Sequence, residues 1–349
     1  MRLLITGGAG FIGSNFIRYY RKNHPDDLIV NFDKLTYAGN PDNLKDIRPG
    51  KNYHFVRGDI ADRKAGERVI RQFRIEGIIN FAAETHVDRS ILGDEEFFRT
   101  NFYGVKILLE TFRRFSLKRF LQISTDEVYG STASGYFSEE SPLQPNSPYA
   151  ASKAAADLLC RAYFKTYKIP VIISRSSNNF GPYQYPEKAI PLFVTNLLQG
   201  KKIPLYGRGA NVRDWLYVED NCRAIDLVLR RGKPGQIYNI GGHNELSNKE
   251  LVGDILNLMN QDSSMVEMVS DRPGHDFRYA LKTEKVRRLG FNPEYTGRKR
   301  FLLALKKTID WYRENHITGI RGKLVTSSAG WISPIQNAGL TGRYFHPVQ

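Results

Sequence analysis

Short apolar runs typical of buried strands alternate with helix-length amphipathic stretches through the first half of the chain. The apolar runs lie at 2–6, 28–32, 53–57, 77–80, 119–124 and 171–174. The stretches with helical spacing lie at about 11–23, 62–73, 95–115 and 148–167. Each of these helices is long enough to carry the chain from one parallel strand to the next. The alternation therefore predicts an α/β fold with a doubly wound, parallel Rossmann-type sheet.

The second half of the chain has shorter elements and more turns than the first half, which predicts a smaller lobe. After about residue 178 the chain enters NNFGPYQYPEKAIP, a loop rich in proline, glycine and aromatic residues, and shorter elements with more turns follow. We predict a Rossmann domain over 1–177 and mainly a C-terminal substrate-binding lobe over 178–317, with some segments returning to the first domain. Residues 318–349 form a tail to which no role is assigned.

The composition fits a globular protein and excludes several other classes. Hydrophobic residues make up 41% and charged residues 25% of the 349, close to the globular average. The only cysteines, Cys160 and Cys222, exclude a disulfide scaffold and a CxxC zinc site. The sequence has no recognisable signal peptide and no membrane-spanning stretch, so we expect a cytoplasmic protein without a membrane partner.

The chain is strongly basic, with 51 Lys and Arg against 36 Asp and Glu, a net charge of +15. Within 282–323, 12 basic residues face 4 acidic ones. Solvated helix faces explain such an excess most simply, and steering of an anionic small substrate is the alternative. Basic and aromatic residues do not interleave as in an RNA-binding strand, so no nucleic-acid partner is expected.

A glycine-rich turn follows the first predicted strand in TGGAGFIGS, where Gly7, Gly10 and Gly13 precede a helix. Glycines allow the backbone to approach a pyrophosphate, which then lies at the positive end of the helix. Asp33 ends the second strand, where a carboxylate accepts the ribose hydroxyls of adenosine and repels a 2′-phosphate. These features predict a dinucleotide site that favours NAD over NADP, although Lys34 beside Asp33 leaves that preference open.

Two further strand ends are expected at the same site. Asp59, after the third strand, is placed to meet the adenine amino group, and the small Ala82 and Ala83 allow the cofactor to approach the fourth strand end. The motif SPYAASK places Tyr149 and Lys153 one helical turn apart on one face. A lysine ammonium favours the tyrosine phenolate, which can take a proton from a carbinol while hydride leaves for the cofactor.

With these motifs in order, the chain resembles the extended short-chain dehydrogenase/reductase family. Within it, the chain is similar to the dTDP-glucose 4,6-dehydratases across most of residues 1–315. The segments that carry this narrower resemblance are DKLTYAGNPDNL, FAAETHVDRSI, STDEVYG, SPYAASKAAADLL, SSNNFGPYQYPEKAIP, NVRDWLYVED and DRPGHDFRYAL. Phe277 and Leu281 depart from the family's usual run, and the tail has no recognisable counterpart in it.

The resemblance implies dehydration of dTDP-α-D-glucose to dTDP-4-keto-6-deoxy-D-glucose, with transient oxidation at C4, elimination across C5 and C6, and hydride return to C6. It implies that Asp126 is the acid, Glu127 the base, and Thr125 a hydrogen-bond partner of the C4 oxygen. One carboxylate must then stay protonated near neutral pH while its neighbour is ionised. Another UDP- or CDP-hexose dehydratase, epimerase or decarboxylase stays an alternative, as does a protein that kept the fold and lost catalysis.

The residues predicted for each role can now be stated together. The predicted catalytic residues are Thr125, Asp126, Glu127, Tyr149 and Lys153. The predicted cofactor-binding residues are Gly7, Gly10, Phe11, Ile12, Gly13, Asp33, Lys34, Asp59, Ile60, Ala82, Ala83, Tyr149 and Lys153. The resemblance assigns substrate contacts to Glu84, His86, Asn178, Arg213, Asn248, Arg272 and His275, although Glu84 and His86 would equally serve as supporting residues. No metal is expected, since the seven histidines lack ligand spacing.

The resemblance also implies how the chain associates with itself. The family commonly forms homodimers in which two helices from each subunit make a four-helix bundle. The stretches 95–115 and 148–167 are long and apolar enough to serve, with ordinary packing on the sheet as the alternative.

Overall fold

A seven-stranded parallel sheet forms the centre of the molecule in the computed structural model, which describes residues 1–47, 49–271 and 273–316. The strand order is β10-β6-β5-β4-β1-β2-β3. The strands are β1 (Arg2–Thr6), β2 (Leu28–Asp33), β3 (Tyr53–Arg57), β4 (Gly77–Asn80), β5 (Arg119–Thr125), β6 (Val171–Ser176) and β10 (Ile237–Ile240). The predicted doubly wound Rossmann-type sheet is therefore confirmed, with β10 as a seventh strand.

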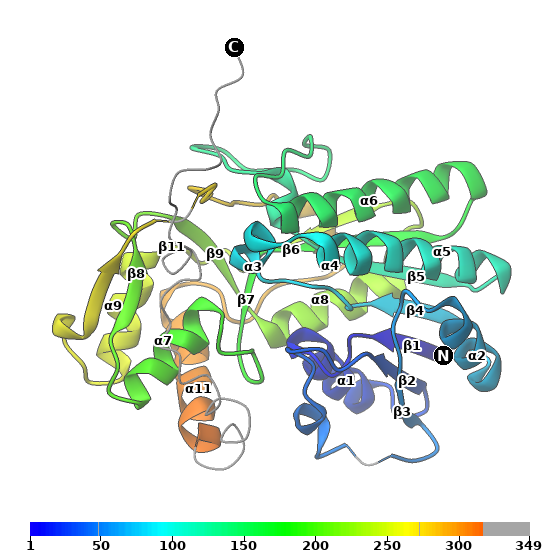
Figure 1. Cartoon of the computed structure of the whole chain (residues 1–349), viewed down its shortest axis with the longest axis horizontal. Coiled ribbons are helices and arrows are strands. Elements are labelled where there is room, and N and C mark those ends of the chain that lie inside the picture. The colour runs from blue at the N-terminus through cyan, green and yellow to red at the C-terminus, as the bar shows by residue number, and fades with distance from the viewer. Residues whose placement is uncertain (48, 272, 317–349) are drawn as a thin grey trace.

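Helices cover both faces of this sheet, which explains why its strands are apolar on both sides (Figure 1). In β1, Leu3 and Ile5 pack toward one face and Leu4 toward the other. The first face is covered by α1 (Phe11–Asn23) and α8 (Val218–Arg231). The second is covered by α2 (Arg63–Phe73), α5 (Val105–Arg114) and α6 (Pro148–Tyr167).

The predicted helix over 95–115 is more irregular than its sequence indicates. It consists of α4 (Glu95–Phe98), a π-helical turn η2 (Arg99–Gly104) and α5, and a short helix α3 (Val87–Leu92) precedes it. Asn101 in the π-helical turn donates to the carbonyl of Glu84 at 3.0 Å and to Ser152 Oγ at 2.9 Å. The irregular turn therefore ties the loop after β4 to α6.

The remaining elements form the smaller lobe, which lies beside the sheet at the left of Figure 1. Its sheet has the order β11-β9-β7, with β7 (Asn178–Phe180), β9 (Val212–Tyr217) and β11 (Glu245–Ser247). A second pair joins β8 (Ile203–Tyr206) to β12 (Val266–Val269). Helices α7 (Ala189–Leu198), α9 (Asn248–Leu258) and α11 (Arg298–His316) enclose an aromatic-rich core.

Four short helices complete the described structure: η1 (Pro41–Leu44), η3 (Asp126–Tyr129), η4 (Ser263–Met265) and α10 (Glu284–Arg287). The lobe's first strand begins at Asn178, but α8 and β10 pack on the first sheet, so the division into domains stays a prediction. The predicted tail over 318–349 lies outside the described residues. None of the described helices has the length and apolar character needed to cross a membrane.

The basic excess in the last part of the chain is partly compensated by ion pairs. On α11, Arg298 pairs with Asp254 of α9, and Lys306 and Arg313 both pair with Asp310. These pairs favour solvated helix faces as the explanation for this part of the charge.

Candidate active site

The glycine-rich turn gives α1 an N-terminus that has no side-chain cap. Gly7 has a φ of 67°, and a Cβ atom there would lie 2.5 Å from the backbone nitrogen of Ala82. A Cβ atom on Gly13 would lie 2.4 Å from the carbonyl oxygen of Gly7. Gly10 precedes α1 and provides no capping side chain. The turn therefore offers backbone N–H groups at a helix N-terminus to a ligand with phosphate-like oxygens.

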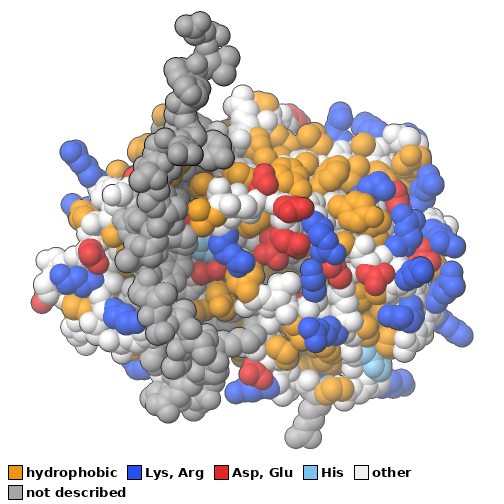
Figure 2. Space-filling model, in the orientation of Figure 1, with side chains coloured by type: hydrophobic (Ala, Val, Ile, Leu, Met, Phe, Trp, Pro, Cys, Tyr) orange, Lys and Arg blue, Asp and Glu red, His pale blue; other side chains and the backbone are white. Residues whose placement is uncertain are grey.

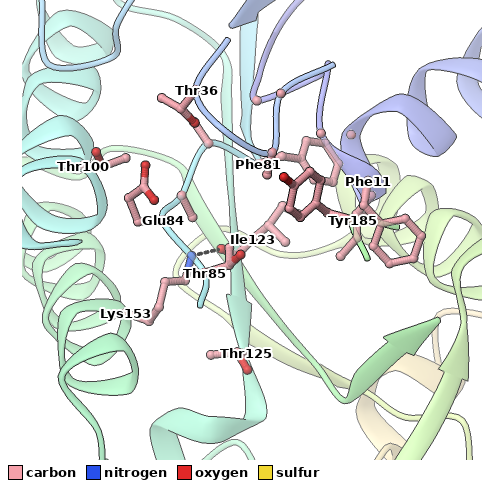
Figure 3. Close-up of a pocket in the computed structure, with 18 of the residues that line it drawn as sticks. Phe11, Thr36, Phe81, Glu84, Thr85, Thr100, Ile123, Thr125, Lys153 and Tyr185 are labelled. Atoms are coloured by element: carbon pink, nitrogen blue, oxygen red, sulfur yellow. Dashed lines mark hydrogen bonds between the residues drawn. The ribbon is translucent and has the colours of Figure 1, made fainter. Parts of the chain in front are cut away.

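A cavity opens from this turn along the carboxyl ends of the strands (Figure 3). Phe11, Phe81 and Tyr185 lie at its α1 side, and Glu84 and Lys153 lie at the opposite side. All the predicted cofactor-binding residues line it: Gly7, Gly10, Phe11, Ile12, Gly13, Asp33, Lys34, Asp59, Ile60, Ala82, Ala83, Tyr149 and Lys153. The structure thus brings these predicted residues into one place.

Asp33 is fixed at the end of β2 by two backbone groups. Its Oδ2 accepts from Ala9 N at 2.9 Å and its Oδ1 from Leu35 N at 2.7 Å. Burial raises the pKa of Asp33, and these two hydrogen bonds oppose that shift. The carboxylate is therefore oriented toward the cavity, where its remaining lone pairs can accept from hydroxyl groups.

Lys34 forms an ion pair that bears on the predicted cofactor preference. Its Nζ lies 3.1 Å from Asp59 Oδ2, and Arg99 contacts the same oxygen at 2.9 Å. Burial would raise the pKa of Asp59, but a hydrogen bond from Ala61 N and these two cations hold it below its ordinary value. This pairing favours Lys34 as a neighbour of a carboxylate rather than as a receptor for a 2′-phosphate.

Tyr149 and Lys153 lie one turn apart near the start of α6, which Ser147 caps by accepting from Ala150 N at 3.2 Å. Tyr149 is buried, and burial together with Glu127 and Asp126 raises its pKa well above the ordinary value, while a hydrogen bond with Thr125 opposes this. Lys153 Nζ donates to the carbonyl of Ile123 at 2.7 Å, as drawn in Figure 3. Burial lowers the pKa of Lys153 to about 8.

Thr125, the last residue of β5, forms a compact acidic site with Asp126 and Glu127, the first two residues of η3. Thr125 Oγ1 donates to Asp126 Oδ1 at 3.2 Å and accepts from Glu127 N at 3.3 Å. Asp126 is 2% exposed, and its Oδ2 has no hydrogen-bond partner among the described residues. Burial, then Glu127 and Asp214, raise the pKa of Asp126 well above its ordinary value. This shift favours the neutral form of Asp126, which is the form that an acid needs.

A second cavity adjoins the first on the side of the lobe. Glu127 and Asn178 line both cavities, and Glu84 lines only the first. Of the other predicted substrate residues, His86, Arg213, Asn248 and His275 line the second cavity. Arg272 lies outside the described residues.

The lobe side of the second cavity is held by the segment around residue 276. Arg213 is buried, donates to the carbonyls of Asp276 at 2.9 Å and Phe277 at 3.3 Å, and lies 4.5 Å from the centre of the Tyr279 ring. Asn178 Oδ1 is buried and has no hydrogen-bond partner within the described chain. The fixed guanidinium suits an anionic group of a ligand, and the unpaired amide oxygen suits a hydrogen-bond donor on it.

The sequence reasoning missed a group of residues that closes the cavity. Residues 182–188, called here the closing segment, contribute Tyr185, Glu187 and Lys188 to the cavity wall. Tyr37, from the loop after β2, donates to Glu187 Oε1 at 3.0 Å. The centre of its ring lies 5.6 Å from the centre of the Tyr185 ring. Lys188 Nζ donates to the carbonyl of Thr85 at 2.6 Å. The available signal was the charged pair Glu187 and Lys188 in an otherwise uncharged loop.

The sugar-facing residues predicted on the β4 loop lie against this segment. His86 Nδ1 accepts from Arg89 N at 3.3 Å, and its Nε2 lies 3.9 Å from Glu187 Oε2. Burial raises the pKa of both Glu84 and Glu187. Glu84 lines the first cavity and His86 lines the second, and their roles stay a prediction.

Known proteins match this chain along most of its length. A family model described as GDP-mannose 4,6 dehydratase matches residues 4–300. A dTDP-glucose 4,6-dehydratase of Streptomyces niveus is 52% identical over 320 residues, which cover 90% of this chain and 94% of that protein. The chain belongs to the dTDP-glucose 4,6-dehydratase family. A further dTDP-glucose 4,6-dehydratase, from Salmonella typhimurium, is 44% identical over 342 residues, covering 90% of this chain and 93% of that protein.

Solved structures extend this likeness to the fold. DesIV, a dTDP-glucose 4,6-dehydratase from Streptomyces venezuelae solved with NAD bound, superposes with a TM-score of 0.87 at 51% identity, covering 90% of this chain and 98% of that one. A UDP-glucose 4-epimerase from Thermus thermophilus, also solved with NAD, gives a TM-score of 0.81 at 29% identity, with coverage of 90% and 99%. Dehydratases and epimerases share this fold, and the sequence of this chain lies with the dehydratases.

Replacing Gly7 with Ala tests the close approach of the glycine-rich turn to β4. The new Cβ would lie 2.5 Å from backbone atoms and would occupy a left-handed conformation, which by itself costs about 1–2 kcal/mol. Urea unfolding should show a loss of at least that size. Gly66→Ala in α2, where nothing lies within 4 Å, is the control and should raise stability by roughly 0.5–1 kcal/mol. Equal stability of the two variants would contradict the tight turn.

Proposed function

We propose that the protein is an NAD-dependent lyase that converts dTDP-α-D-glucose to dTDP-4-keto-6-deoxy-D-glucose and water. The observation that carries this proposal is the adjacent pair Asp126 and Glu127, next to Tyr149 and Lys153. Burial favours the neutral form of Asp126, and Glu127 lines both cavities. A carboxylic acid beside a carboxylate can supply the acid and the base of an elimination. The identity to dTDP-glucose 4,6-dehydratases supports the same reaction.

The first cavity fits NAD in three respects. The glycine-rich turn packs closely on the backbone after β4 and presents N–H groups at the start of α1. Asp33 presents a fixed carboxylate, and Lys34 is paired with Asp59. Related structures contain NAD. When bound, NAD would supply the acceptor for the hydride that leaves C4 of the sugar, and in its reduced form the donor of the hydride that C6 receives.

Tyr149 is the proton acceptor for the C4 hydroxyl in this proposal. Its pKa is raised by burial and by the carboxyl pair, so a nearby cation is needed to favour the phenolate. Lys153 is the buried cation one turn away on the same helix. Thr125 shares a hydrogen bond with Tyr149 and is placed to orient the C4 oxygen between them.

The carboxyl pair then performs the elimination. Oxidation at C4 acidifies the C5 hydrogen, which Glu127 removes as the base and returns to C5 as a proton when the hydride adds at C6. Asp126 donates its proton to the leaving C6 hydroxyl, so that water departs. The hydroxyl of Thr125 fixes the positions of both carboxyl residues, because it donates to Asp126 Oδ1 and accepts from Glu127 N. The second cavity, with Arg213, accommodates the nucleoside diphosphate of the substrate in this arrangement.

An assay with several sugar nucleotides tests the function directly. Incubation with dTDP-glucose should yield a 4-keto-6-deoxy sugar without net reduction of NAD, detected by mass spectrometry as the loss of one water. UDP-glucose and CDP-glucose serve as competing substrates, because the same fold occurs in a UDP-glucose 4-epimerase. Epimerisation of a UDP-sugar with no dehydration of dTDP-glucose would contradict the proposal.

Separate variants of the carboxyl pair test the assigned roles. In Glu127→Gln the Tyr149 and Lys153 pair is intact, so reduced cofactor should form on the enzyme, while overall turnover falls by about 10²–10⁴ because C5 deprotonation is slow. In Asp126→Asn, exchange of the C5 hydrogen with solvent deuterium should persist while water loss fails, as expected for stepwise elimination. Absence of reduced cofactor in Glu127→Gln would overturn the assignment.

In the wild-type protein, water loss should decline as pH rises through the raised pKa of Asp126, since the acid must be protonated.

We also propose a homodimer formed by α4, α5 and α6 through a four-helix bundle. Figure 2 shows apolar side chains gathered over these helices. The exposed large apolar residues in this region are Leu92, Phe98, Tyr103, Leu158 and Tyr167.

A cytoplasmic location is proposed as well, and the free thiols of the buried Cys160 and Cys222 support a reducing compartment.

Sedimentation tests the dimer. The wild-type mass should be about twice the 39.9 kDa of one chain at micromolar concentration. Leu158→Glu places a charge on a side chain that is 55% exposed in the proposed interface and should yield monomer. Leu303→Glu is the matched control, because Leu303 is 51% exposed on α11 in the lobe and should leave the dimer intact. A monomeric wild-type protein would refute the proposal.

A further inference from the structure

Buried charge continues along α6 beyond Lys153. Asp157 lies one turn further along the same buried face and is 1% exposed, and Arg175 on β6 is 2% exposed. Neither has a part in the steps proposed above. Isolated charges are costly to bury, so such groups need a partner or a function.

Two donors hold one oxygen of the Asp157 carboxylate. Its Oδ2 accepts from Arg175 Nε at 2.8 Å and from Ser124 Oγ at 3.0 Å. The Arg175 guanidinium is itself fixed 4.7 Å from the centre of the Tyr129 ring. The second oxygen, Oδ1, is buried and has no hydrogen-bond partner in the part of the chain that the structure describes. The carboxylate is therefore anchored at one oxygen by its ion pair with Arg175 and its hydrogen bond from Ser124, while its second oxygen makes no hydrogen bond within the described residues.

That neighbouring cation is Lys153. Residues four apart on a helix have Cβ atoms roughly 5–6 Å apart, so Lys153 and Asp157 are adjacent. Two consecutive residues of β5 contact the pair, since Ile123 accepts from Lys153 Nζ and Ser124 donates to Asp157. The end of β5 thus fixes both side chains just before Thr125, where the carboxyl pair begins.

We propose that Asp157, anchored by Arg175 and Ser124, is a positioning residue that keeps the Lys153 ammonium charged during hydride transfer. Asp157 does not line either cavity and so acts only through Lys153. The inference rests on the proposed function, because that reaction requires Lys153 as a cation beside Tyr149.

The electrostatics of Lys153 agree with this geometry. Burial lowers the pKa of Lys153 to about 8, and Asp157, followed by Cys160, acts in the opposite direction. Asp157 and Cys160 on α6 are the charged and titratable groups that act on the ammonium most directly. Arg175 on β6 contacts Asp157, and the titratable groups that line the same cavity nearby are Glu84, Asp126, Glu127 and Tyr149. Asp157 combines a position one turn away with a carboxylate oxygen that has no hydrogen bond within the described residues.

The experiment isolates hydride transfer in a Glu127→Gln background, where reduced nicotinamide accumulates and its absorbance gives the rate. The rate with dTDP-glucose is measured from about pH 6 to about pH 10. Hydride transfer needs Tyr149 as a phenolate and Lys153 as an ammonium, so the rate rises as Tyr149 loses its proton and falls on the alkaline side as Lys153 loses its proton. Adding Asp157→Asn keeps the shape of the side chain and removes its charge, so the fall should move to lower pH by about one unit, a roughly tenfold lower rate on the alkaline side.

Two further variants separate electrostatics from structure. Arg175→Gln keeps a donor for Asp157 but removes the guanidinium charge, so the fall in rate should move to higher pH, opposite to Asp157→Asn. Asp254→Asn removes another buried carboxylate that pairs with an arginine, but in the lobe, and should lower stability without moving the pH profile. If Asp157→Asn fails to fold, the direction of the Arg175→Gln shift decides.

Profiles that coincide with the parent profile, or that shift in the same direction for Asp157→Asn and Arg175→Gln, would overturn the role of Asp157. Failure of the wild-type protein to dehydrate dTDP-glucose would instead contradict the proposed function, and this inference with it. Conversion by the wild-type protein with unshifted variants contradicts the role of Asp157 alone.

Discussion

Parallel pairing of the strands is the constraint on which the rest of the molecule depends. In a parallel sheet all the strands end at the same edge, so the residues that follow them converge there. Gly7 follows β1, Asp33 ends β2, Ala82 follows β4, and Thr125 ends β5. Residues separated by more than a hundred positions in the chain thereby line one cavity without any long connecting loop.

Burial is the common physical cause behind the chemistry at this edge. It raises the pKa of Asp126 and Tyr149 and lowers that of Lys153, because each shift favours the neutral form. A neutral Asp126 suits an acid, but a neutral Lys153 would leave Tyr149 without a cation. The site therefore needs a local negative charge near Lys153, and a negative charge also favours the neutral form of Asp126. In the role proposed above, Asp157 supplies this charge from outside the two cavities.

The sequence was most informative where a local pattern determines structure. Buried strands read as continuous apolar runs, and the glycine spacing followed by Asp33 marked the dinucleotide site, so both were predicted. β10 was missed because four residues, IYNI, after a helix carry little periodic signal. The Tyr37–Glu187 hydrogen bond joins residues 150 positions apart, and no local pattern encodes such a contact. The pairing of Lys34 with Asp59 was likewise invisible, since only the fold places β2 beside β3.

The path of the chain after β9 limits how this enzyme can be recombined with its relatives. The chain leaves the lobe after β9, adds α8 and β10 to the large sheet, and then re-enters the lobe at β11. Val286 of α10 then packs in the core between the large sheet and helices α1 and α8, before α11 completes the core of the lobe. A chimera with a single junction near residue 177 would carry foreign α8 and β10 into the parent sheet, against α1 and β6. Exchange of substrate recognition between parents would therefore require several matched junctions, each placed where the chain passes from one core to the other.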